Sequence, residues 1–233
     1  MTAIIDPRMP CSAKARLKEI CEVIELPPFS ALDERVASHP DMLVFIHGNK
    51  IFTSDAYYRE AKREIDKIAS LKNFELILTN DVISSKYPGD VCFNAFILGD
   101  TLIGNLGQVS TAVKEDCKSS GLSATNVKQG YSKCSTAVLG EAVITADVGI
   151  FKAAQGLGKD ALLISQVGVA LDGYDCGFIG GASGVYENKV YFCGDISAHP
   201  DHKKIAEFCN THGFEVISLS GEELYDVGTI LFI

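Results

Sequence analysis

Short apolar runs occur in pairs along this chain, and a tight polar turn joins the two members of each pair. Four such pairs cover residues 42–54, 91–105, 135–147 and 183–194. Three of the four turns carry a glycine, which supplies the positive φ angle that tight hairpins need. The pattern therefore predicts four β-hairpins.

Each predicted hairpin is followed by a helical pattern and then by one more apolar run. The expected helices cover 55–71, 108–120, 149–157 and 199–212, and the expected third strands cover 74–79, 123–127, 161–167 and 214–219. Asp55 and Asp147 are placed to cap helix N-termini, and Pro200 is placed to occupy a first helical position. The chain thus predicts four ββαβ units, repeated about every 47 residues.

The two ends of the chain supply the pieces of a fifth unit. Strand patterns at 2–6 and 224–233 flank a helical pattern at 12–21 and a strand at 22–26. Joined tail to head, these segments complete another ββαβ unit and leave no unpaired edge. We therefore expect an α+β fold, a closed five-fold α/β propeller with both termini paired in one blade. The alternative is a doubly wound α/β sheet, against which the hairpins argue.

Composition fits one domain over residues 1–233. Hydrophobic residues make up 47% and charged residues 22% of the chain, and its formal net charge is −9. This acidity argues against a nucleic-acid partner, which would require a basic face. No membrane-spanning run or signal-peptide pattern is present, so we expect a cytoplasmic protein with no membrane partner.

The eight cysteines form no C-x-x-C pair, so the sequence gives no support for a zinc or redox motif. His199 and His202 lie three residues apart, but no third ligand at a suitable spacing accompanies them. A helix start explains these two histidines better than a metal does. We predict neither a metal nor a cofactor.

Polar residues near the first strand of each unit are the candidates for a site, because those strands would line the central channel. They are Asp41, Asn94, Lys133, Cys134, Asp175, Cys176 and Asp226, with Arg8, Lys128 and His199 expected nearby. A small-molecule ligand in the channel is the expected partner, and a protein partner remains open.

Each candidate has a plainer structural interpretation. Cys134 lies near Lys133 and Lys128, whose charges would favour a thiolate, but a cysteine in a strand is more often a core residue. Asn94, expected within an apolar strand, either contacts a ligand or bonds neighbouring backbone. Asp226 serves equally well as a turn residue. The glycines of residues 177–184 are expected to let strands approach closely near the channel.

A ring of five ββαβ units resembles the pentein superfamily, which includes arginine deiminase, dimethylarginine hydrolase, the amidinotransferases and a non-catalytic ribosome anti-association factor. The segments VKQGYSKCST (127–136), GFIGGASG (177–184) and YDVG (225–228) resemble those of an uncharacterised bacterial member. The resemblance implies a cysteine nucleophile in the last unit, a histidine acid/base and carboxylates that hold a guanidinium. The last strand of this chain has no cysteine, which is a departure from the enzymes.

Two functions remain in view. The first is a hydrolase or transferase that acts on a C–N bond of a guanidine- or amide-like small molecule. In it, Cys134, His199 and Asp226 would be catalytic, and Asp41, Asn94, Lys133 and Asp175 would bind substrate. The second is a non-catalytic binding or assembly protein on the same fold, which the missing terminal cysteine favours.

Overall fold

The computed structural model describes all residues from 1 to 233 and contains five three-stranded sheets and one two-stranded sheet. Four of the three-stranded sheets are built in the same way, from an antiparallel hairpin, a helix and a third strand parallel to the second. Their strands are β3 (Val44–His47), β4 (Lys50–Ser54) and β5 (Glu75–Thr79); β6 (Phe96–Leu98), β7 (Thr101–Gly104) and β8 (Ser123–Asn126); β9 (Thr136–Leu139), β10 (Ala142–Thr145) and β11 (Asp160–Leu163); β13 (Ser183–Tyr186), β14 (Lys189–Phe192) and β15 (Glu215–Ser218). The four predicted ββαβ units are confirmed.

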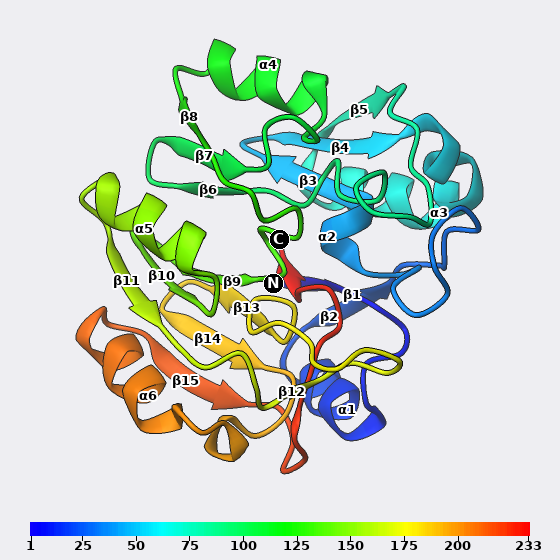
Figure 1. Ribbon diagram of the computed structural model, residues 1–233. Coiled ribbons are helices and arrows are strands. Elements are labelled where there is room, and N and C mark those ends of the chain that lie inside the picture. Colours follow the sequence, from blue (N-terminus) through cyan, green and yellow to red (C-terminus); the bar gives the residue numbers. More distant parts are fainter.

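The helices of these four units lie on the outside of the molecule, and the sheets lie nearer its middle (Figure 1). The helices are α3 (Asp55–Lys72), α4 (Thr111–Ser119), α5 (Val148–Gly156) and α6 (His202–Thr211). Three of the hairpin turns contain a glycine with positive φ, at Gly48, Gly99 and Gly140, as the sequence predicted.

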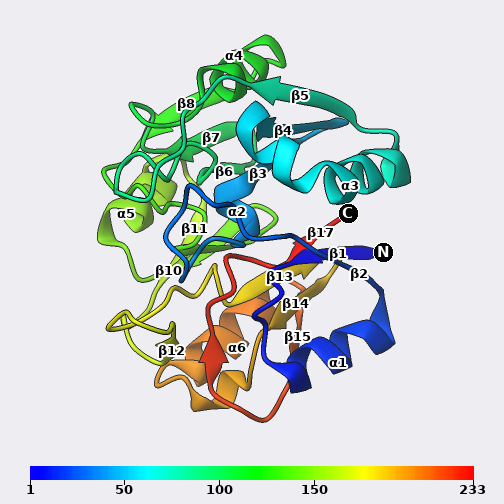
Figure 2. The same cartoon turned by 90° about the vertical axis from the view of Figure 1, so that its right-hand side faces the viewer.

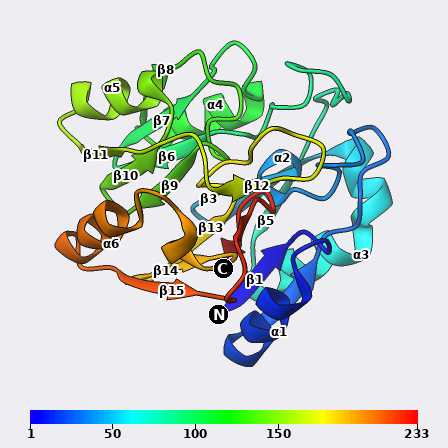
Figure 3. The same ribbon diagram turned by 60° about the horizontal axis from the view of Figure 1, so that its bottom comes forward.

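The chain termini form the fifth three-stranded sheet. Strand β17 (Leu231–Phe232) pairs antiparallel with β1 (Thr2–Ile5), and Ile4 lies opposite Leu231. After α1 (Cys11–Ile20), strand β2 (Glu22–Glu25) pairs in parallel with β1. The two ends of the chain therefore lie close together, as Figures 2 and 3 also show. The predicted pairing of the termini in one unit is confirmed.

The remaining elements are short. They are helix α2 (Pro40–Leu43), the 3-10 helix η1 (Ile196–Ala198), and strands β12 (Val169–Ala170) and β16 (Leu224–Tyr225), which pair in parallel. No helix combines the length and the apolar character needed to span a bilayer.

Several predicted boundaries were wrong near the middle of the molecule. Asn94 lies in a turn before β6 and does not interrupt a strand. Asp41 belongs to α2, and Asp175 lies in the loop after β12, well before β13. Pro200 precedes α6, which begins at His202. Asn94 is bound to the backbone of residues 133 and 134 in another unit, and a periodicity-based prediction does not contain such bonds.

The helix starts follow local capping chemistry. Ser54, not Asp55, caps α3, because its side chain accepts a hydrogen bond from the backbone N–H of Tyr57 at 3.1 Å. Asp147 caps α5 as predicted and accepts from the N–H of Ile150 at 2.8 Å.

The apolar core is divided among several clusters. The largest packs α3 against β3–β5 and their neighbours, and a second packs α6 against β13–β15. Several buried polar side chains, among them Asp41, Asn94 and Asp226, lie in the segments that lead into the first strands. The fold thus leaves a polar centre between separate apolar layers, and the candidate site lies there.

Candidate functional site

Three residues predicted from different units meet at the Cys134 thiol. The Sγ of Cys134 donates to Oδ2 of Asp41 at 3.0 Å, and Nδ2 of Asn94 donates to the same sulfur at 3.3 Å. All three side chains are buried. A thiol between a carboxylate acceptor and an amide donor is a specific polar environment, quite unlike that of a cysteine that fills an apolar core.

Asn94 fixes the loop that carries the thiol. Its Oδ1 accepts hydrogen bonds from the backbone N–H of Lys133 at 2.8 Å and from that of Cys134 at 3.1 Å. The sequence left two roles open for Asn94, a ligand contact or bonding to neighbouring backbone, and the structure shows the second. Asn94 is therefore a positioning residue for Cys134.

Thr229 extends this network toward Lys133. Its Oγ1 donates to Oδ2 of Asp41 at 2.8 Å and accepts from the Lys133 ammonium at 3.3 Å. Lys133, Thr229, Asp41 and Cys134 thus form a continuous chain of hydrogen bonds. The sequence reasoning missed Thr229. Its positive φ of 71°, unusual for a β-branched residue, is visible only in the structure.

Asp226 lies beside the thiol without a hydrogen bond to it. Its carboxylate accepts from the backbone N–H groups of Phe178 at 2.8 Å and Gly228 at 2.9 Å. A Cβ atom on Gly181 would come within 1.9 Å of Oδ1 of Asp226. The glycine-rich segment therefore permits a close approach, as the sequence predicted.

Cys134, Asp226 and His39 line one cavity of about 140 Å³, which we call the thiol pocket. The other lining residues are mostly apolar or aromatic: Val36, Met42, Tyr131, Leu171, Tyr174, Cys176 and Phe178. His39 was not among the candidates drawn from the sequence, although it lies two residues before the candidate Asp41 and shortly before an apolar strand.

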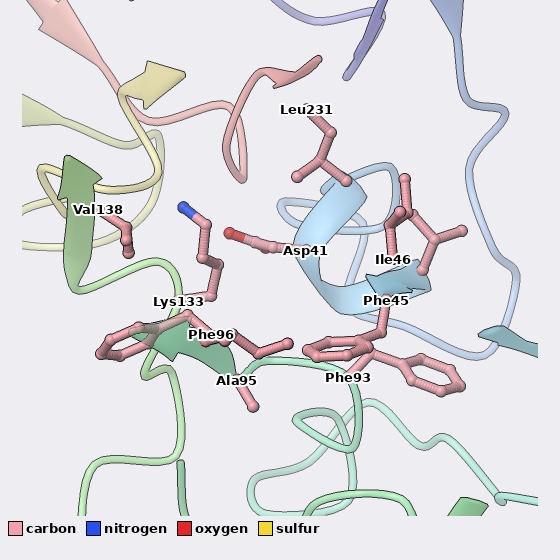
Figure 4. Close-up of a pocket in the computed structure, with 11 residues that line it drawn as sticks. Asp41, Phe45, Ile46, Phe93, Ala95, Phe96, Lys133, Val138 and Leu231 are labelled. Atoms are coloured by element: carbon pink, nitrogen blue, oxygen red, sulfur yellow. The ribbon is translucent and has the colours of Figure 1, made fainter. Parts of the chain in front are cut away.

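A second cavity, which we call the phenylalanine pocket, also has Asp41 in its wall. It measures about 250 Å³ and is lined by Lys133, Asp41 and nine apolar side chains (Figure 4). The hydrogen-bond chain from Lys133 to Cys134 thus joins residues of the two pockets.

Burial controls the charge state of this centre. It raises the pKa of the Cys134 thiol well above its usual value, and the Asp41 and Asp226 carboxylates add to that effect, whereas the Asn94 hydrogen bond opposes it. Burial likewise lowers the pKa of Lys133 and raises that of Asp226. The expectation that lysines would favour a thiolate was wrong, because Lys128 is exposed and Lys133 bonds to Thr136 and Thr229.

His199 and Asp175 are not part of this network. Nδ1 of buried His199 accepts from the N–H of Asp201 at 3.0 Å, and the residue lines a different, very small cavity with Ser165. Asp175 is exposed and lines an open surface hollow. Arg8 pairs with Asp6, next to His39.

One cluster has the donor types of a transition-metal site. A ring nitrogen of His39, a carboxylate oxygen of Asp41 and the sulfur of Cys134 lie within 4.8 Å of one another. Nitrogen, oxygen and thiolate donors of this kind suit zinc. Binding would require Cys134 to lose its proton.

Slow alkylation of Cys134 is the first expected result. Because the thiolate reacts and the thiol does not, we expect iodoacetamide to label Cys134 at least about tenfold more slowly than exposed Cys11 at neutral pH. Labelling of Cys134 should rise only at a pH above the usual range of a cysteine thiol. Replacing Asp41 by asparagine removes a negative charge and should speed labelling. Peptide mass spectrometry over time measures each site, and equal rates at both cysteines would contradict the assignment.

The fold is that of the pentein superfamily. Three solved structures are similar over most of this chain. A mutant DDAH from Pseudomonas aeruginosa in complex with citrulline has a TM-score of 0.60 at 12% identity, covering 94% of this chain and 91% of that one. An amidinotransferase from Microseira wollei has a TM-score of 0.55 at 12% identity, covering 92% and 76%. An agmatine deiminase from C. jejuni has a TM-score of 0.50 at 11% identity, covering 94% and 75%.

Sequence comparison gives a narrower assignment. Residues 4–231 match a family described as "Family of unknown function (DUF6873)", and this chain belongs to that family. The sequence has no match among the curated proteins.

Proposed function

We propose that this protein is an enzyme that acts on a C–N bond of a guanidine-like small molecule, as a hydrolase or a transferase, with Cys134 as the nucleophile. The observation that carries this proposal is the buried Cys134 thiol, which donates to Asp41 and shares its pocket with Asp226. Of the substrate classes expected from the sequence, the two carboxylates favour the guanidine over a neutral amide, because a guanidinium offers planar N–H donors and a positive charge.

The charge balance of the pocket gives the substrate a role in activating the nucleophile. In the free protein, burial and the two carboxylates keep the Cys134 thiol protonated. A cation bound between Asp41 and Asp226 would offset their negative charge and lower the pKa of the thiol. Substrate binding and thiolate formation are therefore coupled in this proposal.

The proposed reaction begins when the Cys134 thiol passes its proton to Asp41, the acceptor of its hydrogen bond. The thiolate attacks the guanidinium carbon, an S–C bond forms, and the C=N electron pair moves to nitrogen. The C–N bond to the leaving amine then breaks as that nitrogen takes a proton. Water, or an acceptor amine in a transferase, attacks the S-bound carbon, and the S–C bond breaks to restore the cysteine.

We assign the proton transfers at nitrogen to His39. It lines the thiol pocket with Cys134 and Asp226, whereas His199 lies in a cavity of its own. The Nε2 of His39 is 3.8 Å from Oδ2 of Asp6, and both side chains are buried.

The neighbours in the pentein fold support this class of chemistry, since their names describe a dimethylaminohydrolase, an amidinotransferase and a deiminase. We infer in addition that the five sheets close into a ring with the two pockets along its axis. The same sheet topology in all five units and the pairing of β1 with β17 support that inference.

A panel of guanidines, including arginine and agmatine, tests the proposal. Release of ammonia or amine is measured, and intact-protein mass spectrometry is used to detect an adduct at Cys134. Cys134→Ala should abolish both signals. Cys176→Ala, a change at another cysteine of the thiol pocket, should retain turnover within a few-fold.

Turnover by Cys134→Ala would overturn the nucleophile assignment. If no member of the panel reacts and a macromolecule co-purifies with the protein in stoichiometric amount, the non-catalytic binding function is favoured instead.

A further inference from the structure

The phenylalanine pocket is an apolar cavity with two charged side chains in its wall. Its lining comes from the first strands of several units, β3, β6 and β9, together with β17 and the turn before β6. The apolar residues are Val44, Phe45, Ile46, Phe93, Ala95, Phe96, Ile97, Val138 and Leu231.

The Lys133 ammonium has unused capacity to donate hydrogen bonds. It makes two long bonds, to the Thr136 carbonyl at 3.4 Å and to Thr229 Oγ1 at 3.3 Å. An ammonium has three donors, so one remains free. No carboxylate forms an ion pair with Lys133, although the side chain points into the cavity (Figure 4).

Asp41 has unused capacity to accept hydrogen bonds. Its Oδ2 is occupied by Cys134 and Thr229, whereas its Oδ1 is buried and has no partner. A buried, unpaired carboxylate oxygen is unfavourable, typically by about 1–3 kcal/mol or more, unless a ligand satisfies it. In Figure 4, the carboxylate end of Asp41 is directed toward the Lys133 side chain.

We propose that the phenylalanine pocket binds a neutral small molecule with a primary carboxamide head and an aromatic or branched apolar body. The carboxamide oxygen accepts from Lys133 Nζ, and the carboxamide N–H donates to Asp41 Oδ1. A carboxamide donates and accepts hydrogen bonds and has no net charge, so it suits a wall with one cation and one anion. A carboxylate ligand would be repelled by Asp41, and an ammonium ligand would be repelled by Lys133. The phenylalanine side chains pack on the body.

This site shares Asp41 with the proposed guanidine site but occupies a different cavity, because the lining of the thiol pocket contains neither Lys133 nor a phenylalanine from residues 45–96. The inference does not depend on Cys134 being a nucleophile. It is tested by binding alone, so it can succeed or fail independently of the proposed reaction.

Phenylacetamide is a suitable probe, with phenylacetate and phenethylamine as charged analogues of similar size. By ligand-observed NMR titration, we expect phenylacetamide to bind with a Kd of about 0.1–1 mM, a range typical of a fragment of this size. Both charged analogues should bind at least about fivefold more weakly. Intermolecular NOEs from the phenyl protons should reach the methyl groups of Val138 and Leu231.

Two variants complete the test. Lys133→Met keeps the length of the side chain but removes the donor, and should weaken phenylacetamide binding about tenfold or more. Val138→Phe fills the cavity from β9 and should weaken all three probes. Far-UV circular dichroism shows whether each variant is folded. The NOE measurement uses the unmodified protein, so it tests the proposal even if a variant does not fold.

Three outcomes would overturn the proposal. They are no binding of phenylacetamide at 10 mM or less (about ten times the weakest expected Kd), charged analogues that bind as tightly as the amide, and NOEs to Tyr131 or Leu171 of the thiol pocket in place of Val138 and Leu231.

Discussion

Gly180→Ala is expected to lower the free energy of unfolding by about 3 kcal/mol or more. A Cβ atom at this position would lie 2.3 Å from the carbonyl oxygen of Thr136 and 2.4 Å from that of Lys133. Both are backbone atoms, so no side-chain rotation relieves the contact. The segment from Gly180 to Ser183 would have to move away from the loop that carries Cys134.

That movement would also break bonds that hold the site together. The N–H of Gly181 donates to the Cys134 carbonyl at 2.8 Å, and the carbonyl of Gly181 accepts from the N–H of Thr229 at 2.9 Å. We therefore expect a loss of stability together with faster alkylation of Cys134, because the thiol becomes exposed to solvent. Urea unfolding followed by circular dichroism measures the first effect, and peptide mass spectrometry measures the second.

Gly156→Ala is the matched control. Gly156 is the last residue of α5, and no atom lies within 4 Å of the position that a Cβ would occupy. Alanine favours helix over glycine by up to about 1 kcal/mol, so this variant should be neutral or slightly more stable. If both glycine variants changed stability by the same amount, the close approach at Gly180 would be refuted.

Asn94→Leu is expected to lower the free energy of unfolding by about 3–5 kcal/mol. The leucine has the same branched skeleton of heavy atoms but removes the acceptor of two buried backbone N–H groups and the donor to Cys134 Sγ. Each buried donor left unsatisfied costs about 1–3 kcal/mol. The effect should appear as a lower urea midpoint with an unchanged slope, which indicates a loss of stability and not of compactness.

Asn210→Leu makes the same chemical change at an exposed position on α6 and should alter stability by no more than about 0.5 kcal/mol. Asn94→Asp separates the two roles of Asn94, since it retains the acceptor oxygen and loses the donor to the thiol. A leucine variant as stable as the unmodified protein would mean that Asn94 does not fix the Cys134 loop.

The repeat, its hairpins and its helices could be predicted because they depend on local patterns. Apolar alternation and turn glycines placed β3–β4 and β9–β10 nearly correctly, and the helical period placed α3 within a residue of its observed end. The pairing of β1 with β17 followed from counting strands, since each edge needed a partner.

The polar centre was predicted only in part. Asp41, Asn94 and Cys134 were candidates, and the structure brings them together. His39 and Thr229 were missed, and His199 was placed at the channel although it lies elsewhere. A histidine next to a helix and a histidine next to a strand look alike in sequence, because the direction of each side chain depends on how the units are rotated against one another.

The sequence by itself determined the hairpins, helices and third strands of the repeated units, because hydrogen bonding within a hairpin and packing of a helix on its own sheet involve residues close along the chain. The joining of the ends followed from the number of strands, since the terminal strands lacked other partners. The tertiary structure alone decided which side chains share the centre and what charge they carry. Asp41 meets Cys134 across 93 positions and Thr229 across 188. Contacts of that range, and the burial that keeps the Cys134 thiol protonated, arise only when separate units pack around a common middle.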